Sequence, residues 1–143
     1  MSLISRLIYL RRSPLKRLVK EVLALYGVEV PSTVEVGPGL RVLHRGFGTV
    51  IHGSTRIGSR VTIYQGVTVG RGDVWVPGNE SKMDRVIVED GAVLCAGAKI
   101  LGKAGTLTVG ANTVVGANAV LTMSTGPNEI WAGVPARKVG VRP

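Results

Sequence analysis

The sequence predicts an all-β fold in which the chain winds as a triangular coil of six-residue sides, preceded by a short helical segment. Three observations predict it. After Gly27 an aliphatic residue returns every six positions, glycine is abundant at 20 of 143 residues, and aromatic residues make up only 4%. Many Val, Ile and Gly with few aromatic rings indicate a thin core of aliphatic side chains. The length is that of one domain.

Composition excludes several other classes of protein. Apolar residues make up 45% of the chain, which is far too many for a disordered segment. A single cysteine, Cys95, excludes a disulfide scaffold. With only His44 and His52 beside it, no metal site is expected. The uncharged run 104–128 is broken by Gly, Asn and Pro, so it is not read as a membrane span.

The first element is a basic helical segment over residues 1–26. Apolar residues at helical spacing predict one helix near residues 2–11 and a second near 14–26, with Ser13 as N-cap and Gly27 as C-cap. Six basic residues against one acidic residue give this segment +5 of the net charge of +9. The helices either pack on the coil or on neighbouring subunits, or make weak contact with an anionic membrane surface.

No motif in the chain indicates a nucleic-acid partner. No small-residue cleavage site follows the apolar N-terminal stretch, so we expect a cytoplasmic protein. Because the repeat begins at Val30, we also expect the coil to fold without residues 1–26.

The second element is the repeat. Thirteen positions, spaced by six with three interruptions, are all Val, Ile or Leu. Four residues after most of them the side chain is again small or aliphatic, and glycine often follows directly. The thirteen positions are Val30, Val36, Val42, Ile51, Ile57, Ile63, Val69, Val88, Leu94, Ile100, Val109, Val115 and Leu121.

A period of six fits a coil with three flat sides, in which one turn takes about 18 residues. The aliphatic residue points into the narrow prism, and Gly or Asn permits the backbone geometry of the corners. Successive turns then hydrogen-bond as parallel strands. The sequence therefore predicts about four coils over residues 27–128, with a loop insertion at 71–85 and a C-terminal tail over 129–143.

Several stretches of the coil follow the order and spacing of a known family. They are GVEVP at 27–31, VGPGL at 36–40, His44, GTVI at 48–51, QGVTVG at 65–70, AGAKILG at 96–102 and AGVPARKVG at 132–140. Over residues 27–140 the chain resembles the hexapeptide-repeat acyltransferase superfamily, and within it the serine acetyltransferase type. The resemblance implies a left-handed parallel β-helix, acetyl-CoA as co-substrate and a homotrimer, with direct transfer to an acceptor hydroxyl.

The resemblance also implies a catalytic pair. His44 lies in the three-residue expansion between Val42 and Ile51, where the family has its general base. Glu29 stands fifteen residues earlier, where the family has an aspartate that orients this histidine. The alternatives are a structural histidine and an exposed glutamate at the mouth of the first coil.

Two departures from the serine-specific pattern bear on the acceptor. The stretch Asp84-Arg85-Val86 lacks the family's second active-site histidine, although Arg85 could still contact the acceptor if it is not simply a surface arginine. The helical segment before the coil is also short. We therefore expect an O-acetyltransferase acting on a sugar or polysaccharide precursor. The alternatives are a serine O-acetyltransferase of cysteine biosynthesis and a non-catalytic β-helix scaffold.

The donor site is expected in a groove between two neighbouring β-helices. By resemblance, the backbone amides of Gly70, Gly97 and Ala98 would meet the pantetheine arm and the thioester. Three cations would meet the phosphates unless they are only solvated surface charges, namely Lys103, Arg137 and Lys138.

Overall fold

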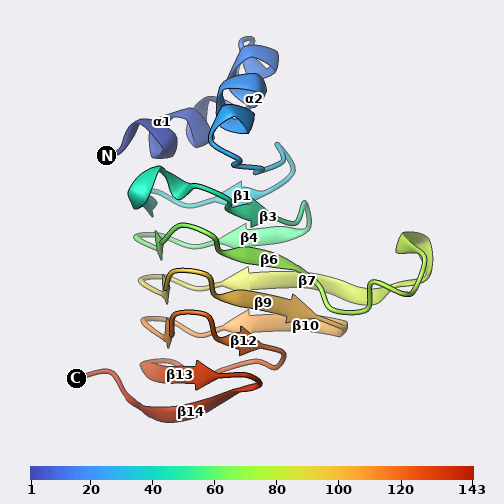
Figure 1. The fold of residues 1–143 in the computed structure, drawn as a ribbon, viewed down its shortest axis with the longest axis vertical. Coiled ribbons are helices and arrows are strands. Elements are labelled where there is room, and N and C mark those ends of the chain that lie inside the picture. The colour runs from blue at the N-terminus through green and yellow to red at the C-terminus, as the bar shows by residue number, and fades with distance from the viewer.

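The computed structural model describes residues 1–143 as a three-sided coil with two helices at one end (Figure 1). The helices are α1 (Leu3–Leu10) and α2 (Lys16–Leu25), and two short 3-10 turns are η1 (His44–Gly46) and η2 (Gly78–Glu80). The strands are β1 (Glu35–Val36), β2 (Arg41–Val42), β3 (Val50–Ile51), β4 (Thr55–Ile57), β5 (Thr62–Ile63), β6 (Thr68–Arg71), β7 (Lys82–Val88), β8 (Val93–Leu94), β9 (Lys99–Gly102), β10 (Ala104–Val109), β11 (Val114–Val115), β12 (Val120–Leu121), β13 (Glu129–Gly133) and β14 (Ala136–Val141).

The strands form three sheets, one for each side of the coil. Face 1 has the order β1-β4-β7-β10, face 2 has β2-β5-β8-β11-β13-β14, and face 3 has β3-β6-β9-β12. All neighbouring strands are parallel except β13 and β14, which are antiparallel. The predicted stack of about four coils is confirmed, and the fold is a left-handed parallel β-helix.

The predicted core is also confirmed. Twelve of the thirteen hexad positions are buried, and the remaining one, Val36, is half-buried against them. Nine of the positions four residues later are buried as well, namely Val34, Leu40, Thr55, Val61, Val67, Ala92, Ala98, Thr113 and Ala119. The prism is filled by aliphatic side chains with Trp131 as the one buried aromatic residue, which explains the low aromatic content of the sequence.

Two of the three corners are built from residues in the left-handed backbone region. From the second coil onward, each of these corner residues donates its N–H to a carbonyl of the preceding coil, as from Gly97 to Gln65 and from Asn118 to Ala96. A Cβ on Gly97 would collide with the Asn118 side chain of the next coil, so this position requires glycine. One corner has Gly27, Gly48, Gly66, Gly97 and Asn118, and the other has Gly39, Arg60, Gly91, Asn112 and Asn128.

Both predicted helices are present and shorter than expected. Gly27 is the predicted C-cap of α2: its φ is 65°, and Val28 N–H donates to the Leu23 carbonyl, as in a Schellman motif. The N-terminus differs, because Ser13 accepts from the Leu15 N–H in a turn and α2 begins only at Lys16. Neither helix is long and apolar enough to cross a membrane.

The helices are joined closely to the first coil. Helix α1 lies at the free edge of β2, where the Val42 N–H donates to Ser5 Oγ at 3.0 Å and the Leu40 N–H donates to the Tyr9 hydroxyl at 3.0 Å. The buried Arg11 guanidinium donates to carbonyls at the start of the coil, and this burial lowers the pKa of Arg11.

Four apolar helix residues belong to the same core as the coil, namely Ile4, Ile8, Val19 and Leu23. The expectation that the coil folds without residues 1–26 therefore disregards contacts that the first coil uses.

The insertion between β6 and β7 projects from the corner between faces 3 and 1 (Figure 1). Asp73 holds it together: its carboxylate accepts from the Ser81 hydroxyl at 2.7 Å and from Arg71 Nε at 2.9 Å. These hydrogen bonds lower the pKa of Asp73, and the one from Ser81 has the larger effect. Trp75, in this insertion, is 73% exposed.

Residues 129–143, expected as a tail, form a hairpin. Its first strand, β13, continues face 2 in parallel with β11, and its second strand, β14, returns antiparallel. The Glu129 carboxylate accepts from the Trp131 indole, from the Gly126 N–H and from Lys138. The hydrogen bond from Lys138, followed by those from Trp131 and Gly126, lowers the pKa of Glu129 to about 2.

Candidate active site

His44 lies in the turn η1, at the corner where the chain passes from face 2 to face 3. Three consecutive residues of this turn are left-handed, with φ of 49° at His44, 56° at Arg45 and 62° at Gly46. The imidazole is exposed, as expected for a residue outside the prism.

The turn is fixed by Gly46, whose backbone is buried beneath it. A Cβ there would lie 2.7 Å from a methyl group of Val42, so only glycine fits. The Gly46 N–H donates to the Leu43 carbonyl and its own carbonyl accepts from the Thr49 N–H, both at 2.9 Å. A left-handed conformation costs a residue with a side chain about 1 kcal/mol or more. Such strain concentrates at functional sites, and here it presents the imidazole to solvent.

The His44 imidazole has one close aromatic neighbour and no hydrogen bond. Its ring centre lies 5.9 Å from that of Tyr64 on the next coil, with the planes inclined by 40°. On the other side of the turn Phe47 packs against Tyr26 at 5.6 Å between ring centres. A ring held in this way, with both nitrogens unpaired by protein groups, has the freedom to accept a proton from a bound hydroxyl.

Glu29 lies at the end of face 3 rather than against His44. It forms a parallel bridge with Val50, where its N–H donates to the Thr49 carbonyl and its carbonyl accepts from the Ile51 N–H. The side chain is exposed, and no hydrogen bond or ion pair joins it to His44 within the chain. His44 thus lies in the turn before β3, and Glu29 lies beside β3. The two residues are on adjacent segments, but their side chains do not form a hydrogen bond or an ion pair.

The three backbone amides that were predicted to meet the pantetheine arm and the thioester are not equivalent. The amides of Gly97 and Ala98 already donate to the carbonyls of Gln65 and Cys95, so both hold the coil together. Gly70, in β6, has an ordinary φ, and no atom lies within 4 Å of the place that a Cβ would take. The fold does not require glycine at position 70, and its missing side chain leaves face 3 accessible to a ligand.

The predicted phosphate contacts lie at two separate places. Lys103 follows β9 on face 3, with its ammonium 5.8 Å from the ring centre of Trp75 in the insertion. Arg137 and Lys138 lie in β14 on face 2, where Lys138 is paired with Glu129 at 2.9 Å. Lys103 and Arg137 therefore remain the more available cations.

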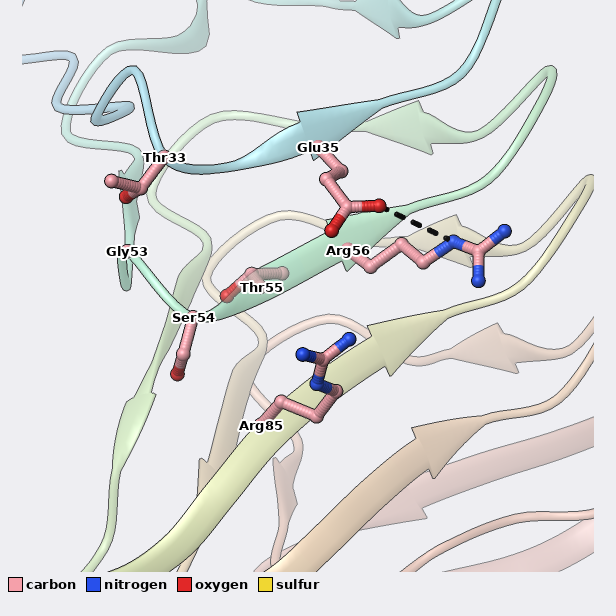
Figure 2. A pocket seen from close by; sticks show the side chains of 7 residues that line it. All are labelled: Thr33, Glu35, Gly53, Ser54, Thr55, Arg56 and Arg85. Carbon is pink, nitrogen blue, oxygen red and sulfur yellow. Dashed lines mark ion pairs between the residues drawn. The ribbon is translucent and has the colours of Figure 1, made fainter.

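Arg85 lies in β7 on face 1, in a small polar pocket of about 130 Å³ (Figure 2). Its guanidinium points toward β4, where Arg56 pairs loosely with Glu35 at 3.9 Å. The buried Thr55 hydroxyl in this region has no hydrogen-bond partner. A single chain does not bring Arg85 together with His44, because face 1 and the corner between faces 2 and 3 are different parts of the prism.

Tyr64 is a neighbour of His44 that sequence reasoning missed. The signal was available: β2 pairs with β5 so that Val42 lies beside Ile63, and the residue after Ile63 is therefore placed at the same corner as the turn.

Elsewhere, His52 accepts a hydrogen bond from the Ser54 N–H, and burial raises the pKa of the Cys95 thiol. A thiol of raised pKa is a poor nucleophile.

No family model matches the chain. Among curated proteins it is 36% identical over 126 residues to a serine acetyltransferase of Staphylococcus xylosus, which covers 87% of the chain and 54% of that protein. It is 32% identical over 126 residues to the serine acetyltransferase of Bacillus subtilis, with 87% and 54% covered. The chain thus spans about half the length of the curated relatives it matches.

Solved structures give the same result. A serine acetyltransferase of Brucella abortus in complex with coenzyme A matches with a TM-score of 0.75 and 25% identity over 98% of the chain and 54% of that protein. One from Neisseria gonorrhoeae matches with a TM-score of 0.76 and 25% identity, over 96% and 51%. A truncated serine acetyltransferase is 31% identical, with a TM-score of 0.72 over 95% and 55%.

Proposed function

Because the chain belongs to the hexapeptide-repeat acyltransferase superfamily, we propose that it transfers an acetyl group from acetyl-CoA to an acceptor hydroxyl. The observation that carries the proposal is the strained, exposed turn that presents His44 beside face 3, where Gly70 leaves the surface open. The solved relative that holds coenzyme A supports the choice of donor.

In the proposed reaction the neutral His44 imidazole accepts the proton of the acceptor hydroxyl as its oxygen attacks the thioester carbonyl. The carbon–sulfur bond then breaks, and the imidazolium returns the proton to the departing CoA thiolate. Glu29 would orient and stabilise the imidazolium once the two side chains close on a bound acceptor. Transfer is direct, so no residue of the chain is acylated.

The donor would lie along face 3, with its arm over Gly70 and its phosphates near Lys103, whereas Arg137, on face 2, would be supplied by another copy. A single flat face gives only one wall of such a groove, and the second wall is best supplied by another copy of the chain. We propose a homotrimer with three-fold symmetry, in which Arg85 of one copy approaches the His44 corner of its neighbour. The separation of these residues within one chain supports this arrangement.

Two acceptors are candidates. Serine is favoured by the relatives described above, which are named serine acetyltransferases, and it takes precedence over the sugar acceptor that we expected from the sequence. A sugar hydroxyl is the second candidate, because Val86 follows Arg85 where a second histidine would stand. Both share the same base and donor.

A thiol-release assay with acetyl-CoA tests the proposal. Purified protein is incubated with L-serine, with free sugars and with nucleotide-linked sugars, and free CoA is measured together with the mass of the acetylated product. We expect acceptor-dependent release of CoA that is lost in His44→Ala and kept in the matched control His52→Ala. No release with any acceptor would identify the chain as a non-catalytic scaffold.

A further inference from the structure

A basic groove runs between α2 and the first coil. Its volume is about 790 Å³, and its wall includes four cationic side chains against a single carboxylate, Glu29. The cations all come from the helical segment, whereas the opposite wall is formed by residues 27–32 and Val50. The four cationic residues are Arg11, Lys16, Arg17 and Lys20.

Three of these cations have no partner in the chain. The Arg11 guanidinium is occupied by the carbonyls of Ile8, Pro31 and Val34. The side chains of Lys16, Arg17 and Lys20 are exposed and make no hydrogen bond or ion pair, and Glu29 is more than 4 Å from each of them. Three unpaired positive charges therefore line one groove.

Their placement is fixed by the packing of α2. Val19 and Leu23 are buried against the coil, and this holds Lys16 and Lys20, four residues apart, on the side of the helix that lines the groove. Like charges at this spacing destabilise a helix. An anion bound between them would remove that repulsion.

The groove adjoins the segments that carry the candidate active site. Glu29 and Val50 belong both to its wall and to the end of face 3. The turn that carries His44 contacts the same segment, since the Gly48 N–H donates to the Tyr26 carbonyl and Phe47 packs on Tyr26. A ligand in the groove can thus extend to the reacting hydroxyl.

We infer that this groove binds the diphosphate group of the acceptor, held by Lys16, Arg17 and Lys20, so that the acceptor hydroxyl reaches His44. The inference rests on the proposed acetyl transfer and favours the second of its acceptors, a sugar linked to diphosphate. Serine, the first acceptor, carries a single carboxylate, which does not need three cations. A diphosphate offers several charged oxygens that can pair with all three.

Binding of inorganic pyrophosphate to the full chain, measured by calorimetry without acetyl-CoA, tests the site itself. We expect the double variant Lys16→Gln/Lys20→Gln to bind about tenfold or more weakly, which corresponds to about 1.4 kcal/mol. Lys16→Arg/Lys20→Arg should restore binding, because charge is retained. The control Arg41→Gln/Lys82→Gln removes two exposed, unpaired charges elsewhere and should bind as the unaltered chain does. Equal binding by all variants would overturn the inference.

A vesicle-binding experiment distinguishes the two possible sources of the phosphoryl group, namely a soluble acceptor and a lipid headgroup. We expect pyrophosphate and a nucleotide-linked sugar to compete for the groove in solution. If phosphatidylglycerol vesicles bind through Lys16 and Lys20 while neither soluble compound does, the groove serves a membrane surface and the inference is wrong.

Kinetics separate this inference from the proposed function. We expect Lys16→Gln/Lys20→Gln to raise the KM for a nucleotide-linked sugar about tenfold or more, with an unchanged KM for acetyl-CoA. If CoA is released with serine or a free sugar and the diphosphate adds nothing, the inference fails and the proposed function stands. If no acceptor supports release but pyrophosphate binding depends on Lys16 and Lys20, the proposed function fails and the phosphoryl site remains.

Discussion

His44 combines a backbone conformation that histidine rarely adopts with a side chain that makes no hydrogen bond. We predict that His44→Ala lowers turnover by about 10²–10⁴-fold, the usual contribution of a general base, with an unchanged KM for acetyl-CoA. Steady-state kinetics on the accepted substrate measure both values. The fold should be retained, because the imidazole is exposed and makes no hydrogen bond within the chain. A loss of donor binding in this variant would assign His44 a structural role instead.

Gly70 gives a prediction about the donor. Since nothing occupies the space where its Cβ would lie and its φ is ordinary, Gly70→Leu should fold as the unaltered chain does. The new side chain would cover face 3 and raise the KM for acetyl-CoA by about tenfold or more. Ala104→Leu, at an exposed position of β10 on face 1, is the matched control and should leave this KM unchanged. Equal values for both variants would show that the donor binds elsewhere.

The residue scale also shows what could not be predicted from the sequence. The six-residue repeat does not predict the left-handed backbone of the three η1 residues. That conformation depends on the burial of Gly46 beneath the turn, which only the structure shows. Lys138 fits a phosphate contact by motif, yet the register of β13 with β14 brings it to Glu129. Glu29 makes no hydrogen bond or ion pair with His44, and Arg85 lies on another face of the prism, and neither fact can be read from the order of residues in the chain.

Elements were more predictable than sites. The aliphatic residues that recur every six positions face the prism and are buried. Their burial decides the fold independently of the loop sequences, so the repeat alone predicts it. Gly27 as the cap of α2 follows from a local rule. The hydrogen bonds from α1 to the first coil were missed, because Ser5 and Tyr9 are polar residues of an amphipathic helix whose partners lie about 30 or more positions away.

Helix α1 is predicted to stabilise the first coil through these bonds. Ser5→Ala leaves the buried Val42 N–H without an acceptor, and loss of such a partner costs about 1–3 kcal/mol. Tyr9→Phe should cost somewhat less, because the Leu40 N–H is only partly buried. Urea denaturation gives both values. Arg6→Ala, at an exposed position of α1 whose side chain makes no ion pair, serves for comparison, and an equal loss in all three would argue against a specific role at the coil edge.

The C-terminal hairpin should make stability depend on acid. The folded-state pKa of Glu129 is about 2, against 4.5 for the free group. A depressed pKa adds stability that is complete above pH 4.5 and is lost as the pH falls toward 2. The melting temperature of the unaltered chain should therefore decline across this range more steeply than that of Glu129→Gln, which lacks the titrating group. Parallel pH profiles would rule out this source of acid sensitivity.

At the scale of the whole molecule, stability is a sum over neighbouring coils, since each coil contacts mainly the ones beside it. Short strands of two residues on faces 2 and 3 leave little area for any one pairing. Assembly with other copies would add the surface that one thin prism lacks. We predict a mass of three chains by light scattering at micromolar concentration. A mass near 15.0 kDa, that of one chain, would contradict the trimer and with it the shared donor groove.

The contacts of α1 at the β2 edge of face 2 have a consequence for solubility. A stack of parallel strands with a bare terminal layer resembles the growing tip of an amyloid fibril, on which further chains can pair. Here the Ser5 and Tyr9 side chains occupy the amide groups at one tip of face 2, and β14 reverses direction at the other. The β2 edge of face 2 is therefore closed to a further strand. Removal of α1 should convert a chain of fixed length into a seed for end-to-end polymers.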